Sequence, residues 1–309
     1  MLINFLIYAT NENITYVKTT LYSLLINKDS TSSYRIFCLC HKDDQINSQI
    51  TSMFKNEKHF GINYIEVDKL IVDLNLENDY DFTKCFMFYL NRIFDEINIK
   101  IGLKRHNEYI KKRVNEECLN KIIYLNHNVI IQEDMNDLWK INLSDHEYFG
   151  FIYNPFNENQ IYDDVVIINV NRISNVEIKT DKYEKGSSKK IINSNYNSII
   201  MKIVKSGIEL NKIVDAKPIL LEYFNECIKE LDLKFGLINI DYNKYYHVLA
   251  NSDQEINKKD LKIILNSINK PHIINFIELP WIEDHVIYQD IWKQYYKQSL
   301  YYEYINNLN

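Results

Sequence analysis

The stretch "KIIYLNHNVIIQEDMNDLW", Lys121 to Trp139, decides the fold of this chain. Apolar residues lead up to Leu125 and resume at Val129, as in a buried strand that breaks briefly and continues. Three polar side chains, Asn126, His127 and Asn128, fill the break. A metal site at such a break would need carboxylates, and this break has none.

Short apolar runs alternate with helical periodicity on both sides of this break. The predicted strands cover residues 2–9, 34–40, 62–68, 121–131, 146–154, 163–171 and 272–281. The predicted helices cover residues 13–27, 44–56, 81–97, 219–233 and 286–307. This alternation predicts an α/β fold with a mostly parallel sheet that is covered by helices on both faces. Such sheets bind ligands at the carboxyl ends of their strands, and the break lies at one of these ends.

Composition limits the class of protein. The chain has 309 residues, of which 46% are hydrophobic, so it is long enough for one large α/β domain or two small ones. A net charge of −6 argues against general nucleic-acid binding. The polar segment 174–197 is the best candidate for a mobile loop.

The sequence also predicts a cytoplasmic location. No apolar run approaches the roughly 18–20 residues that a membrane span requires, and the N-terminus has the pattern of a first strand instead of a signal peptide. No cysteine pair has zinc-ligand spacing. We expect Cys38 and Cys40 to be reduced and buried on one face of a strand.

Two motifs carry a resemblance to a known family. They are the opening stretch and the later "HIINFIELPW…IWKQYYKQ", where the family has a strand ending in Tyr-Leu-Asp-x-Asp and an Ile-Ile-His-Phe strand leading to Lys-Pro-Trp. From Ile3 to about Tyr296 the chain resembles the family 8 glycosyltransferases. The resemblance implies a Rossmann-like GT-A fold over residues 1–279, followed by an aromatic-rich helical tail, 280–309. It also implies a UDP-sugar donor, a Mn²⁺ ion and retention of the anomeric configuration.

The chain departs from the family at each position that holds the metal. The two aspartates correspond to Asn126 and Asn128, the late histidine to Asn275, and the phosphate-facing lysine to Leu279. Asparagine offers a neutral carbonyl oxygen, whereas hard divalent cations depend on carboxylate charge. We therefore expect no metal cofactor.

The nucleotide-sugar site implied by the resemblance is partly retained. At the end of the first strand the family has an aspartate that reads uracil, where this chain has Asn11, whose carbonyl could still accept the uracil N3–H. Tyr16 is a candidate stacking platform for the base. The complete set of candidates is Ala9, Thr10, Asn11, Tyr16, Asn126, His127 and Asn128.

Three residues are candidates for catalysis. Lys217 follows Ala216 where the family has Asp-Gln, and a lysine near the diphosphate could replace the cation. Asp163 and Asp164 could be a rebuilt acidic pair, and with Tyr162 they replace the family's Asn-Ser-Gly and could crowd the donor-sugar pocket. The plain alternatives are a surface lysine and two solvated acids.

Other features also leave alternatives open. The break at 126–128 could be a polar turn that caps backbone groups, a metal site or a metal-free ligand contact. His127 could donate to a phosphate, point to solvent or pack locally. The aromatic C-terminal helix could meet a membrane surface or a partner, or pack against the main domain.

Two functional hypotheses follow. In the first, the protein is a degenerate glycosyltransferase that has lost Mn²⁺-dependent transfer, binds a glycan or nucleotide weakly, or serves as partner to an active transferase. In the second, it is a hexosyltransferase that moves sugar from a UDP-sugar to a glycan or lipid with little or no metal.

Overall fold

The computed structural model describes residues 1–42, 44–68, 70, 86–100, 119–154, 157–174, 196–210, 213, 215–238, 266–277, 279–283 and 286–308. Most of the predicted mobile loop, residues 175–195, lies outside the described residues, as do residues 81–85 of one predicted helix.

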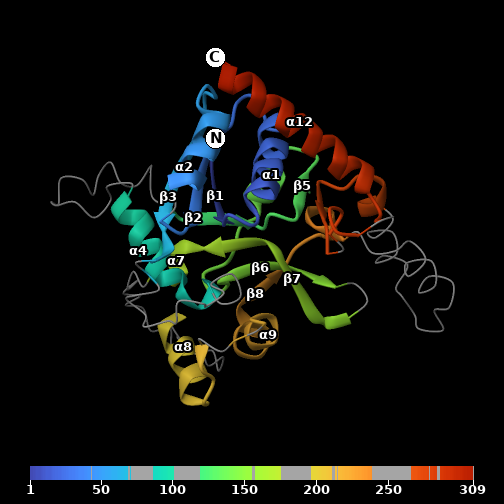
Figure 1. Ribbon diagram of the computed structural model, residues 1–309. Helices are drawn as coiled ribbons and strands as arrows, with labels where there is room; N and C mark the ends of the chain where they lie inside the picture. Colours follow the sequence, from blue (N-terminus) through green and yellow to red (C-terminus); the bar gives the residue numbers. More distant parts are fainter. Residues whose placement is uncertain are drawn as a thin grey trace.

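The centre of the molecule is a seven-stranded sheet in the order β3-β2-β1-β4-β7-β6-β8 (Figure 1). Its strands are β1 (Leu2–Ala9), β2 (Ser33–Cys40), β3 (Phe60–Glu66), β4 (Lys121–Leu125), β6 (Phe149–Asn154), β7 (Asn157–Asn169) and β8 (Ile228–Glu230). Neighbouring strands are parallel from β3 to β4 and between β6 and β8, whereas β7 is antiparallel to both of its neighbours. The predicted mixed, mostly parallel sheet is confirmed.

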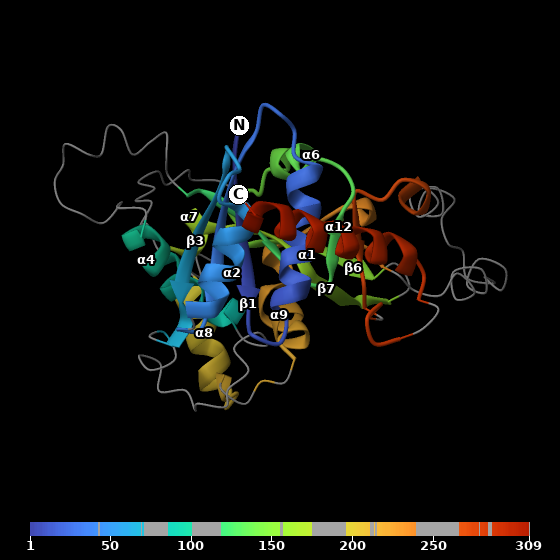
Figure 2. The ribbon, with the colours of Figure 1, turned by 45° about the horizontal axis from the view of Figure 1, so that its top comes forward.

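Helices cover both faces of this sheet (Figures 1 and 2). One face packs against α1 (Ile14–Ile26), α2 (Asp44–Phe54) and α6 (Asn136–Lys140). The other packs against the 3-10 helix η2 (Phe86–Tyr89), α4 (Leu90–Lys100), α7 (Val170–Ile173), α8 (Tyr196–Lys205) and α9 (Lys217–Phe224). Helix α1 buries Val17, Leu21 and Leu24, the face that the helical period predicted, and Leu25 is partly buried beside them.

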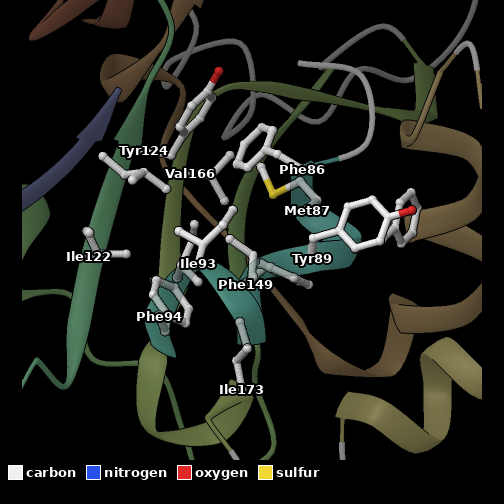
Figure 3. Packing of buried hydrophobic residues seen from close by; sticks show 14 of the residues in the cluster. Phe86, Met87, Tyr89, Ile93, Phe94, Ile122, Tyr124, Phe149, Val166 and Ile173 are labelled. Carbon is white, nitrogen blue, oxygen red and sulfur yellow. The ribbon is translucent and has the colours of Figure 1, made fainter. Parts of the chain in front are cut away.

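Aromatic side chains make up about a third of the core on the α4 side. Figure 3 shows Ile93 and Phe94 of α4 beside Phe149 of β6, with Phe86 and Tyr124 near the top of the view. Phe86 and Tyr124 lie with ring centroids 4.6 Å apart. On the opposite face Cys38 and Cys40 are buried together as free thiols, as predicted.

The broken strand does not continue in the same sheet, which corrects the prediction for residues 121–131. Strand β4 ends at Leu125, and β5 (Val129–Ile131) begins in a second sheet of order β5-β10-β9, with β10 (Ile273–Asn275) and β9 (Leu237–Ile238). The hydroxyl of Thr20 donates to the carbonyls of His127 and Val129, at 3.0 and 2.9 Å, and fixes the turn. The polar break is therefore the point where the chain passes between two sheets.

The predicted helix at 219–233 is also wrong in its second half. Helix α9 ends at Phe224, the 3-10 helix η4 (Asn225–Cys227) follows, and Ile228–Glu230 forms β8. Strand β8 pairs in parallel with β6, so tertiary hydrogen bonds override the helical pattern there. A further 3-10 helix, η5 (Leu233–Phe235), leads on to β9.

The C-terminal helix α12 (Gln289–Leu308) packs across α1 and α2 (Figures 1 and 2). Lys18 of α1 and Glu303 of α12 form an ion pair at 2.8 Å in a mostly buried position. One face of this helix thus packs against the main domain, which was one of the three alternatives. No helix within the described residues is long and apolar enough to cross a membrane.

Candidate functional site

The candidate site lies where β4, β7 and β10 meet. The antiparallel pairing of β4 with β7 puts Val165 opposite Leu125, so Asp164 lies beside the first residue of the turn, and the Asn126 amide donates to the Asp164 carbonyl at 2.8 Å. Strand β10 pairs with β5 so that Asn275 lies opposite Val129. Register alone therefore brings residues from three distant segments together.

Three asparagines and one aspartate form a continuous hydrogen-bonded network, which we call the Asn–Asp network: Asn126, Asn128, Asn275 and Asp164. Asn126 Nδ2 donates to Asp164 Oδ1 at 2.7 Å, and Asn275 Nδ2 donates to Asp164 Oδ2 at 2.8 Å. Asn128 Nδ2 donates to Asn275 Oδ1 and to the Phe276 carbonyl, both at 3.2 Å. Asn128, Asn275 and Asp164 are all buried.

The orientation of every amide in this network follows from Asp164. An ionised carboxylate only accepts hydrogen bonds, so Asn126 and Asn275 must turn their NH₂ groups toward it. The oxygen of Asn275 then faces Asn128, which must present its own NH₂ group. The Asn128 Oδ1 is left buried without a hydrogen-bond partner.

Asp163 and Lys217 form a half-exposed ion pair beside the network, with Lys217 Nζ 3.1 Å from Asp163 Oδ1. Burial and the neighbouring Asp164 raise the pKa of Asp163 to about 6, although the Lys217 ammonium opposes this. Burial lowers the pKa of Lys217, but Asp163, Asp164 and Asp215 outweigh it and raise that pKa above its usual value. Lys217 is therefore a charged lysine already paired with a carboxylate.

An aromatic cluster lies on the other side of the turn. Tyr16 stacks on Trp281 with ring centroids 3.9 Å apart, and the His127 ring lies 6.2 Å from Tyr16 and 6.1 Å from Trp281. Burial lowers the pKa of His127 despite the opposing effect of Asp164, so the imidazole is neutral at pH 7. His127 thus packs locally, and the face of Tyr16 that contacts Trp281 is covered.

The end of β1 forms a closed polar turn. Asn13 Oδ1 accepts from the Thr10 amide at 2.7 Å, and Asn13 Nδ2 donates to the Tyr8 carbonyl at 3.4 Å. Ala9 is buried and Asn11 is exposed at the tip of this turn. Sequence reasoning missed Asn13, whose side chain makes no cap bond to α1 and instead closes this turn.

The remaining predicted positions are mostly structural. Tyr162 and Ala216 are buried, and Tyr162 packs in the core on the α1 side of the sheet. Asp215 Oδ1 accepts from the Lys217 amide at 3.0 Å and caps the start of α9. Leu279 is half-buried and provides no charge.

The residues present do not fit the Mn²⁺ ion that the resemblance implies. Asp164 Oδ1 and Oδ2 each accept from one asparagine amide, Asn126 Oδ1 accepts from the His127 amide, and Asn275 Oδ1 accepts from Asn128 Nδ2. Within the network only Asn128 Oδ1 lacks a partner, and one neutral oxygen does not make a divalent-cation site. A divalent cation needs several inward-facing oxygens with carboxylate charge, whereas here NH₂ groups face the one central carboxylate. Across the described ranges, no group of three or more His, Cys, Asp or Glu side chains is arranged to hold a metal.

Comparison with known proteins gives structural similarity without sequence similarity. Neither protein-family models nor curated proteins match the sequence. The galactosyltransferase LgtC, solved with donor and acceptor sugar analogues, superposes with a TM-score of 0.59 at 11% identity, and the match covers 96% of each chain. Mouse xyloside xylosyltransferase 1 superposes with a TM-score of 0.52 at 10% identity, covering 89% of this chain and 97% of that one.

Longer proteins also contain this fold. The bifunctional glycosyltransferase WbbM superposes with a TM-score of 0.63 at 9% identity, and GlyE of Streptococcus pneumoniae TIGR4 with 0.58 at 14%. The match covers 95% of this chain in both cases, but only 49% of WbbM and 60% of GlyE. This chain therefore has a GT-A-like fold that matches LgtC, and it is structurally similar to the family 8 glycosyltransferases LgtC, GlyE and xyloside xylosyltransferase. At such low identity the similarity extends to the fold alone.

Proposed function

We propose that this protein is a glycosyltransferase-like protein that does not carry out Mn²⁺-dependent transfer from a UDP-sugar, and that it acts by binding a glycan or nucleotide weakly or as partner to an active transferase. The Asn–Asp network carries this proposal. In it, hydrogen bonds between side chains of the protein replace the bonds that a metal ion would make.

The cost of opening the network supports the proposal. A cation beside Asp164 would need the side-chain oxygens of Asn126 and Asn275 as ligands. For these oxygens to face the cation, both side-chain amides would have to turn over, so that their NH₂ groups no longer face Asp164. Each turn breaks a hydrogen bond to a charged group, and such bonds contribute roughly 1.5–3 kcal/mol. The free energy of these broken hydrogen bonds would be offset only by the bonds of the ion to one carboxylate and to neutral oxygens.

Local charge also disfavours a nucleotide diphosphate. Asp163 and Asp164 are both acidic, Lys217 is paired with Asp163, and His127 is neutral at pH 7. A diphosphate bound here would meet carboxylates, and no unpaired cation lies among the side chains of this site that the structure describes. Transfer from a UDP-sugar needs positive charge to stabilise the leaving diphosphate.

One observation favours the second candidate function, metal-independent hexosyl transfer, and it concerns Lys217. Its ammonium is half-buried at the start of α9, beside the network. If a ligand displaced Asp163, Lys217 could offset the charge of a leaving diphosphate without metal. That arrangement would support metal-independent hexosyl transfer to a glycan or lipid acceptor.

The deciding experiment is calorimetric titration of UDP into the full chain with and without Mn²⁺. The proposal predicts no measurable binding, or weak binding that Mn²⁺ does not change. Binding that Mn²⁺ strengthens tenfold or more would contradict it. The variant carrying Asn126→Asp, Asn128→Asp and Asn275→His is the positive control, because it should gain Mn²⁺-dependent UDP binding if these positions correspond to the family site.

Turnover assays separate the two candidate functions. Metal-free release of UDP from UDP-glucose or UDP-galactose would favour the second candidate if Lys217→Met abolishes it. Lys140→Met is the matched control, since Lys140 also pairs with an aspartate, Asp137 at 3.5 Å, but on exposed helix α6. Absence of turnover in the wild type supports the first candidate.

A further inference from the structure

The outward face of α12 is apolar over its last three turns. Leu300, Tyr301, Tyr304 and Leu308 are exposed by 43, 67, 62 and 68% respectively, and we call these four side chains the C-terminal stripe. Tyr304 lies three or four residues from each of the other three, so the four side chains share one face of the helix. Between Gln298 and Leu308 the sequence has a single charged residue, Glu303.

Contacts on the opposite face prevent the helix from turning this stripe inward. Glu303 pairs with Lys18 at 2.8 Å, and Asn306 Nδ2 donates to the Met53 carbonyl at 3.1 Å. The Ser299 hydroxyl lies 3.4 Å from that of Thr19. The C-terminal stripe is thus a fixed feature of the surface.

A groove of about 490 Å³ runs beside the C-terminal stripe. Tyr22 of α1 forms one wall, and residues of α12 from Lys297 to Asn306 form the other. Tyr301 belongs to both the stripe and the groove, so a projecting surface and a hollow one lie next to each other on the same helix.

We propose that the C-terminal stripe is a homodimer interface in which α12 of one copy lies antiparallel to α12 of a second copy. A two-fold interface requires one surface that complements itself, and the stripe with its adjoining groove meets that requirement. Tyr304 lies near the two-fold axis, and Leu308 of each copy enters the groove of the other.

Charge favours the antiparallel direction. It places Lys297 of one copy against the last turn of α12 in the other, where unpaired carbonyl groups carry partial negative charge. Glu303, the one charged residue between Gln298 and Leu308, does not face its counterpart in the second copy, because it is directed at Lys18 of its own chain. Tyrosine and leucine side chains would fill the centre, and tyrosine is enriched at protein interfaces.

The size of the surface predicts a weak dimer. Since an aromatic side chain carries roughly 200 Å² of surface, the stripe exposes on the order of 400 Å². With the groove walls, two copies would bury about 1,000 Å², the lower limit for a specific interface. Interfaces of this size are typical of weak, transient complexes.

Sedimentation equilibrium of the full chain from about 1 to 300 µM tests the proposal. A monomer–dimer equilibrium is expected, and Tyr304→Glu should weaken it at least tenfold. Met201→Glu is the matched control, because Met201 is 53% exposed on α8 and lies outside the stripe. Tyr304 is exposed, so its variant should unfold at the wild-type temperature.

Mild oxidation gives a second measurement. Tyr304→Cys should form a disulfide-linked dimer, because residue 304 of each copy lies near the two-fold axis, whereas Met201→Cys should not. A wild type that stays monomeric at 300 µM, or a dimer that Tyr304→Glu leaves unchanged, would overturn the proposal. If the monomer binds anionic lipid vesicles and Tyr304→Glu abolishes this binding, the stripe is a membrane-binding surface instead. None of these results depends on whether the protein binds UDP.

Discussion

Replacing Asp164 with asparagine tests the Asn–Asp network directly, because the substitution keeps the shape of the side chain and removes its charge. Asp164 Oδ1 and Oδ2 accept from Asn126 and Asn275 at 2.7 and 2.8 Å. An asparagine at 164 offers one oxygen and one NH₂ group, so it can accept from only one of these two partners in their present orientation. The other amide must lose its acceptor or turn over.

Turning either amide breaks another contact. Asn126 Oδ1 accepts from the His127 amide at 2.8 Å, and Asn275 Oδ1 accepts from Asn128. Asn275 is only 1% exposed, so water cannot replace a lost partner there. Losing one hydrogen bond to a charged group and leaving a buried amide unpaired each cost roughly 1–3 kcal/mol. We expect Asp164→Asn to lower the free energy of unfolding by about 3 kcal/mol.

Urea unfolding at pH 7, followed by tryptophan fluorescence and circular dichroism, measures this change. Asp163→Asn is the matched control, because the adjacent Asp163 forms only a half-exposed ion pair. Its replacement should change the free energy of unfolding by about 1 kcal/mol or less in either direction. A change below about 0.5 kcal/mol for Asp164→Asn would refute the reasoning. It would mean that Asp164 does not orient the asparagines.

Three further predictions concern charged groups. The folded-state pKa of Asp163, about 6, lies above its ordinary value of 3.8, so the folded protein retains a proton that the unfolded chain releases. The free energy of unfolding of the wild type, relative to that of Asp163→Asn, should therefore fall by about 1 kcal/mol as pH rises from 4 to 6. Urea titrations at several pH values measure this difference. A difference that does not change with pH would contradict the raised pKa of Asp163. Lys18→Met should lower the free energy of unfolding by about 3 kcal/mol because it leaves Glu303 unpaired, and adding Glu303→Met should recover most of the loss. Failure of the double variant to recover would show that the pair itself is stabilising. Lys121→Met should cost about 2 kcal/mol by thermal or urea unfolding, because two carbonyls at the end of α6 lose their donor. An unchanged midpoint would show that water replaces this lysine.

The sequence by itself determined the first half of the fold. Apolar runs and helical periods placed β1, α1, β2 and α2 to within a few residues, because these elements bury a periodic face in a local pattern. The resemblance to family 8 glycosyltransferases also selected Asn126, Asn128 and Asn275 as members of one site, and the structure brings them together. Local pattern and motif were sufficient for these features.

Only the tertiary structure decided how the site is built. Asp164 bonds to partners 38 and 111 residues away in the sequence, and no local signal marks it as the centre of a network. Strand register determines these contacts, and so does the passage of the chain from β4 into a second sheet at Asn126. The covering of Tyr16 by Trp281 likewise depends on where the last strand and α12 pack. Sequence determined which polar groups lie at the strand end, and long-range pairing determined that they bond to one another.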